Sequence, residues 1–128
     1  MRQEAVLDTG AASSFIHADS LPAGVRVKAL SSAVNVRGAN SQRLVIRGTV
    51  DLMVQVGSCK SHMTFYVAPS LAATLILGCD FCDLHVESIQ PRRRVVELDD
   101  GSMTRILSGQ ATKGLGAAIL GESGDKTE

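Results

Sequence analysis

Residues 5–11, Ala-Val-Leu-Asp-Thr-Gly-Ala, constrain the fold of this chain more than any other stretch. The apolar run before Asp8 predicts a short buried strand. Thr9 and Gly10 then predict a tight turn, because glycine adopts backbone angles that are closed to other residues. The pattern therefore places one carboxylate at the end of a buried strand. Taken alone, Asp-x-Gly is also common in ordinary turns, where it has no catalytic role.

A second apolar stretch ends in glycine later in the chain. Residues 75–78 read Leu-Ile-Leu-Gly, and residues 74–77 are expected to form another buried strand. Residues 79–85 are long enough for one short helix, with Asp80 and Asp83 near its start, where the helix dipole favours acidic side chains.

The interval between these two stretches predicts strands. Apolar and polar residues alternate over residues 50–56 and again over 59–67, a period of two that indicates one buried and one exposed face. Further short strands are expected at residues 25–27, 34–36, 43–46, 86–89, 94–98 and 103–107. Many short strands between Gly and Pro turns, with one short helix in the C-terminal part, favour an all-β domain, a closed barrel or a sandwich.

Length and composition limit the class of protein. The 128 residues suit one domain, which we assign to residues 1–107. Residues 108–128 are rich in Gly, Ser, Lys and Glu and are expected to form a flexible linker or tail, with 115–120 as weak exceptions. The 13 basic residues balance the 13 acidic ones, which gives no reason to expect a nucleic-acid partner. No apolar run approaches the roughly 18 residues of a membrane span, so no membrane partner is expected.

The chemistry available at Asp8 depends on a second carboxylate. Hydrolysis of a peptide bond by carboxylates requires one ionised group and one protonated group, which share a proton when they lie about 3 Å apart. No other aspartate in the chain is followed by Thr-Gly or Ser-Gly. A dyad built on Asp8 therefore requires a second copy of the chain, related by a two-fold axis that brings equivalent residues together.

Residues 5–16 and residues 75–82, Leu-Ile-Leu-Gly-Cys-Asp-Phe-Cys, together resemble the retroviral-type (retropepsin) aspartic proteases. The likeness is nearest to the proteases of gypsy-type LTR retrotransposons and covers roughly residues 5–107. It implies a barrel-like homodimer with its active site at the interface. In that arrangement Asp8 is the catalytic carboxylate, Thr9 hydrogen-bonds across the dimer and Gly10 binds the substrate backbone.

The resemblance also implies how an extended polypeptide is bound. A flap is expected at the hairpin tip, and pockets for substrate side chains are expected beside the catalytic turn and on the second apolar stretch. The residues expected to contact substrate are Ala11, Ala12, Gly38, Ala39, Asn40, Thr74 and Ile76.

The chain departs from the family pattern in two places. Seven residues precede Asp8, where family members usually have a further strand, so the chain is expected either to be a fragment of a polyprotein or to dimerise through other strands, such as residues 94–107. The acid and the arginine that often form a bridge in retroviral enzymes are replaced by Ala12 and Cys79. Because both partners are replaced together, no unpaired buried charge is left.

The resulting expectation is an aspartic endopeptidase, active as a homodimer, that processes a retrotransposon-like or retrovirus-like polyprotein. The alternative is a catalytically silent dimerisation or peptide-binding module with the same fold. Three cysteines cannot all pair within one chain, so an intracellular location is expected, in the cytoplasm or within virus-like particles.

Cys79 and Cys82 leave a third interpretation open, because a Cys-x-x-Cys pair at a helix start is typical of thiol redox proteins. The chain has no second such pair and no histidine at ligand spacing from this one, so neither a metal site nor a cofactor is expected. His17, His62 and His85 are scattered and are expected to be surface residues or to be satisfied by hydrogen bonds.

Overall fold

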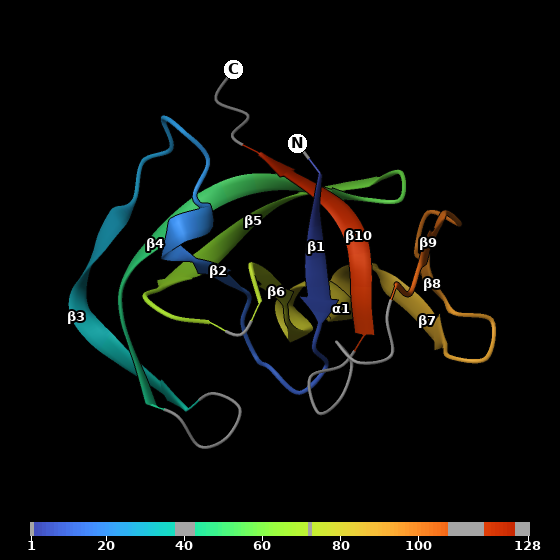
Figure 1. Cartoon of the computed structure of the whole chain (residues 1–128), viewed down its shortest axis with the longest axis horizontal. Helices are drawn as coiled ribbons and strands as arrows, with labels where there is room; N and C mark the ends of the chain where they lie inside the picture. Colours follow the sequence, from blue (N-terminus) through green and yellow to red (C-terminus); the bar gives the residue numbers. More distant parts are fainter. Residues whose placement is uncertain (1, 38–42, 72, 108–116, 125–128) are drawn as a thin grey trace.

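The computed structural model describes residues 2–37, 43–71, 73–107 and 117–124, and these form a domain built mainly of strands (Figure 1). The strands are β1 (Arg2–Leu7), β2 (Phe15–His17), β3 (Lys28–Arg37), β4 (Arg43–Val56), β5 (Cys59–Ala68), β6 (Leu75–Leu77), β7 (Val86–Gln90), β8 (Val95–Leu98), β9 (Met103–Arg105) and β10 (Ala117–Gly124). A short 3-10 helix, η1 (Ala18–Ser20), follows β2, and the single α-helix of the described residues, α1 (Cys79–His85), follows β6. The all-β class with one short helix is therefore confirmed.

Seven strands form the larger sheet, in the order β10-β1-β6-β2-β5-β4-β3. β10 pairs with β4 as well as with β1, so the sheet curves around the core and is not flat (Figure 1). β1 and β6, the second and third strands of this order, run parallel, with Leu7 paired to Leu77. This pairing joins the two apolar stretches on which the sequence prediction depends.

The smaller sheet contains β7, β8 and β9 in antiparallel order. It lies beside α1, away from the long hairpin of β3 and β4 (Figure 1). The strands expected at residues 86–89, 94–98 and 103–107 correspond to these three elements.

The core follows the alternation in the sequence. Along β4 and β5 one face is buried, and its side chains meet those of β1, β6, α1 and β8 in one main cluster. Phe65, Phe81 and Leu77 are among the largest side chains that are fully enclosed there. A second cluster forms around Ile46 and Ile76, where residues of β3 and β4 pack towards β1, β2 and β6.

The strand expected at residues 25–27 is wrong. The strand begins only at Lys28, which pairs with Thr49 of β4. The alternation at residues 25–27 has another cause, since Val25 packs against the main core while Val27 is 43% exposed.

The expectation of a flexible tail over residues 108–128 is corrected at residues 117–124, which form β10. The backbone of β10 pairs antiparallel with β1 from Arg2↔Glu122 to Leu7↔Ala117, and with β4 at residues 53–55. Glycine and serine made this segment look unstructured, but an open edge of β1 offers unpaired N–H and C=O groups that favour a partner strand.

None of the helices within the described residues is long and apolar enough to cross a membrane.

Truncating the chain before β10 measures how much this strand contributes to the stability of the fold. A chain that ends at residue 107 is expected to lose roughly 2–5 kcal/mol in the free energy of unfolding, since each lost backbone hydrogen bond contributes about 1 kcal/mol net. Denaturant unfolding with hydrogen exchange at β1 measures this loss. As a control, removing only residues 125–128 is expected to change stability by less than about 0.5 kcal/mol. Equal stability of the two truncated chains would show that β10 adds nothing.

Candidate active site

Asp8 is held at the end of β1 by main-chain hydrogen bonds. Its N–H donates to the Leu77 carbonyl of β6 at 2.8 Å, and its own carbonyl accepts from the Ala11 N–H at 3.1 Å. The Gly10 N–H donates to Asp8 Oδ1 at 2.9 Å, which fixes the orientation of the carboxylate. The carboxylate is thus oriented by its own turn and is partly exposed.

The turn residues after Asp8 face outward. Thr9 and Gly10 are both exposed. A side chain at Gly10 would place its Cβ 3.3 Å from Asp8 Oδ1, a crowded contact with the carboxylate. The Thr9 carbonyl accepts a hydrogen bond from Cys79 Sγ at 3.0 Å, so the turn is also joined to the start of α1.

The second glycine, Gly78, lies directly against the Asp8 turn. A Cβ at Gly78 would collide with the carbonyl oxygen of Ser13 and would lie 2.6 Å from that of Ala11. The next residue, Cys79, donates its N–H to the Ala11 carbonyl at 2.7 Å. This close approach of two backbones explains why the second stretch ends in glycine.

Ser14 and Asp80 form a link that the sequence prediction missed. Ser14 is fully buried; its Oγ accepts from the Gly78 N–H at 3.0 Å and donates to Asp80 Oδ1 at 2.6 Å. Asp80 Oδ2 accepts from the Ser14 N–H at 3.1 Å. Asp80 was expected only to favour the start of the helix. No local pattern in the sequence signals this link, because the two residues are 66 positions apart and meet only in the fold.

The residues expected to bind substrate are only partly brought together. Ala11 packs at the edge of the second cluster, to which Ile76 belongs, and Ala12 is exposed beside it. Thr74 is exposed before β6, and its hydroxyl donates to the Glu4 carbonyl at 3.0 Å. Their roles in substrate binding remain predictions.

The expected flap residues Gly38, Ala39 and Asn40 lie outside the described residues. The strands on either side of them are described. β3 and β4 are paired as far as Arg37↔Arg43, and Val34 and Val36 pack on the second cluster, which also contains Ile76. The hairpin that would carry a flap is therefore anchored beside β1 and β6.

The Cys82 thiol is buried at the start of α1, next to Cys79. Burial, and then the neighbouring Cys79 thiol, raise the pKa of the Cys82 thiol to about 12. Because the thiolate is the reactive form, Cys82 is not the nucleophile that a redox pair would use. The redox interpretation of the pair stays a prediction.

A comparison with known families gives one match. A family model described as the PEG10/RTL1 protease domain covers residues 4–105. The matched range includes the Asp8 turn, the Gly78 contact and all of the smaller sheet. No individual curated protein gives a significant match to the chain.

Replacing Ser14 tests the link between the two glycine stretches. Ser14→Ala leaves the buried Gly78 N–H without its acceptor, so the free energy of unfolding is expected to fall by about 1–3 kcal/mol. Ser13→Ala removes the neighbouring hydroxyl, for which no hydrogen bond to a described residue is seen, and is expected to cost less than about 0.5 kcal/mol. Denaturant titration compares the two, and equal losses would mean that the Ser14 link is not stabilising.

Proposed function

The chain belongs to the PEG10/RTL1 protease domain family, which is retropepsin-like and derives from gypsy-type retrotransposons, and from that premise we propose that it is an aspartic endopeptidase active as a homodimer. The observation that carries the proposal is the Asp8 turn. One carboxylate is oriented by the Gly10 N–H, anchored to Leu77 and left partly exposed beside exposed Thr9 and Gly10.

The proposed reaction needs two copies of Asp8 that share one proton. The ionised carboxylate takes a proton from water, and the water oxygen attacks the carbonyl carbon of the peptide. The protonated carboxyl gives its proton to the carbonyl oxygen, which forms a tetrahedral intermediate. When the C–N bond breaks, the leaving nitrogen receives the proton of the dyad. One hydroxyl of the tetrahedral intermediate gives its proton to the other carboxylate as the product carboxyl group forms, which restores the shared-proton state.

The dimer follows from this requirement. Asp8 is the only carboxylate in the turn formed by residues 8–11, and a two-fold axis close to it would bring its symmetry mate within reach. Thr9, exposed in the single chain, is proposed to meet the partner subunit across that axis.

The proposed substrate is an extended polypeptide, a polyprotein of retrotransposon or retroviral type. The hairpin of β3 and β4 supports this choice, because a hairpin that closes over an extended chain excludes water and offers main-chain hydrogen bonds. The proposed location is intracellular, in the cytoplasm or within virus-like particles. There Cys59, Cys79 and Cys82 would stay as the free thiols that the structure contains.

Asp8→Asn tests the catalytic assignment. The variant keeps the size of the side chain but cannot be ionised, so peptide cleavage is expected to fall by at least about a thousandfold while the fold is kept. Cleavage of a peptide library followed by mass spectrometry measures the loss, with circular dichroism as the check on folding. Asp19→Asn, at an aspartate whose side chain is 92% exposed, is the matched control and should keep full activity. Undiminished cleavage by Asp8→Asn would overturn the assignment.

Mixing wild-type and Asp8→Asn subunits tests whether activity requires a dimer. If both carboxylates are needed, equal amounts of wild-type and Asp8→Asn subunits should leave about a quarter of the activity of the same total amount of wild type, since only one dimer in about four is intact. Independent monomers would leave about half. Sedimentation velocity of the same mixtures reports the oligomeric state. A dimer that cleaves no peptide and does not bind pepstatin would instead indicate a catalytically silent dimerisation or peptide-binding module.

A further inference from the structure

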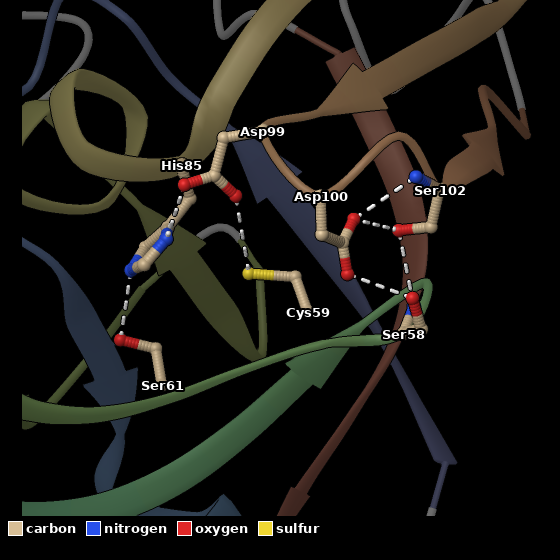
Figure 2. A network of polar contacts seen from close by, with 7 residues as sticks. All are labelled: Ser58, Cys59, Ser61, His85, Asp99, Asp100 and Ser102. Atoms are coloured by element: carbon tan, nitrogen blue, oxygen red, sulfur yellow. Dashed lines mark hydrogen bonds and ion pairs between the residues drawn. The ribbon is translucent and has the colours of Figure 1, made fainter.

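Three potential metal ligands meet on elements other than the Asp8 turn. Cys59 begins β5, His85 ends α1, and Asp99 lies in the turn between β8 and β9. The Cys59 sulfur, the His85 ring nitrogen and the Asp99 carboxylate all lie within 4.8 Å of one another. Figure 2 shows the thiol and the imidazole approaching the same carboxylate from two sides. Cys59 Sγ lies 3.9 Å from Asp99 Oδ1, and His85 Nδ1 lies 3.6 Å from Asp99 Oδ2.

His85 has one nitrogen with a partner and one without. Nε2 lies 3.1 Å from Ser61 Oγ, a hydrogen-bond distance. Nδ1 is buried and has no hydrogen-bond partner among the described residues, and its 3.6 Å separation from Asp99 Oδ2 is too long for a hydrogen bond. When Nε2 carries the proton and donates to Ser61, the Nδ1 lone pair faces a carboxylate oxygen. A positive charge between these two acceptors, either a proton or a bound cation, would stabilise this arrangement.

The backbone that carries these ligands is fixed independently of any ion. The Asp99 N–H donates to the His85 carbonyl at 2.8 Å, which joins the turn to the end of α1. On the other side, Asp100 accepts hydrogen bonds from the Ser58 hydroxyl at 2.7 Å and the Ser102 hydroxyl at 2.6 Å (Figure 2). These contacts hold the β8–β9 turn against the turn that precedes Cys59. The three donor atoms are therefore positioned in advance.

We propose that Cys59, His85 and Asp99 form a zinc site that joins the larger sheet to the smaller one. Zinc binds thiolate sulfur at about 2.3 Å, imidazole nitrogen at about 2.0 Å and carboxylate oxygen at about 2.1 Å in tetrahedral geometry. At tetrahedral angles these bond lengths separate the donor atoms by roughly 3.4–3.6 Å. The 3.9 Å separation runs from Cys59 Sγ to Asp99 Oδ1 and the 3.6 Å separation from His85 Nδ1 to Asp99 Oδ2, and all the donor atoms lie within 4.8 Å of one another. Binding one ion therefore requires the Asp99 carboxylate to rotate and the three side chains to close by up to about 1 Å. Water fills the fourth position, next to Asp99, whose side chain is 47% exposed.

The charges also fit a divalent cation. One thiolate and one carboxylate together balance a charge of two, and the neutral histidine adds none. Burial, and then the carboxylates of Asp99 and Asp100, raise the pKa of the Cys59 thiol, so the group holds its proton in the metal-free protein. Zinc binding displaces that proton. Ser61 acts as the positioning residue, because its hydrogen bond to Nε2 leaves Nδ1 free to bind the metal.

The competing account is an ion pair between a protonated His85 and Asp99. It needs no cation, and in it the protonated Cys59 thiol only donates a hydrogen bond to Asp99 Oδ1, whereas the zinc site requires the thiolate and the carboxylate as ligands. The two accounts therefore differ in a property that can be measured: sulfur coordination to an added metal.

The experiment adds zinc, or cobalt as its spectroscopic substitute, to the purified 128-residue chain. One zinc ion per chain is expected by isothermal titration calorimetry. The thermal midpoint is expected to rise, because an ion that binds only the folded state stabilises it. Cobalt is expected to give a thiolate-to-cobalt charge-transfer band together with the visible absorption of a tetrahedral site. Absence of a midpoint shift with zinc and of a thiolate band with cobalt would overturn the proposal.

Variants assign the ligands. Cys59→Ser is expected to remove the charge-transfer band, and Asp99→Asn, at a half-exposed position where folding is not at risk, is expected to weaken zinc binding strongly. Ser61→Ala is expected to weaken it about tenfold. The matched control is the double variant Cys79→Ser, Cys82→Ser, which removes the other two thiols and should keep the band. If the band disappears in that control, or persists in Cys59→Ser, the metal is bound elsewhere and the proposal is wrong.

Discussion

The contact between the Asp8 turn and Gly78 is the constraint on which the site depends. β1 and β6 are parallel neighbours, so the turns that follow them leave the sheet at the same edge. The carbonyls of Ala11 and Ser13 occupy the space that any side chain at Gly78 would need. The buried Ser14 hydroxyl then joins the Gly78 N–H to the Asp80 carboxylate through two hydrogen bonds. The carboxylate of Asp8 is thus positioned by backbone contacts that few other sequences would allow.

The parts of the fold that could be predicted are those with a local signal. Alternation along β4 and β5 identified the hairpin, and the glycines after Asp8 and Leu77 marked the two turns. β10 could not be predicted, since its pairing depends on the open edges of β1 and β4 rather than on its own composition. The strand predicted at residues 25–27 was wrong for the opposite reason. The local alternation is present in the sequence, but these residues lie outside β3, which begins at Lys28.

The polar networks were missed because they exist only in the folded chain. Ser14 and Asp80 are far apart in sequence and meet because β6 places the start of α1 against the catalytic turn. Cys59, His85 and Asp99 come from three elements with no motif spacing, whereas the sequence drew attention to the Cys-x-x-Cys pair of Cys79 and Cys82. In the structure Cys79 donates a hydrogen bond to the Thr9 carbonyl and Cys82 is buried. Spacing in the sequence detects ligands that share one turn or helix, and it cannot detect ligands that different elements bring together.

The single chain already holds most of what a dimeric site would need. The hydrogen bonds that orient Asp8 come from Gly10 and Leu77 of the same chain, so they do not have to form when two subunits meet. Association would then add the second carboxylate to a group that is already oriented, and little conformational entropy would be lost at the catalytic turn itself. In the proposed dimer, encounter of two subunits would then be the step that completes the site, and activity would follow the concentration of the dimer rather than that of the chain.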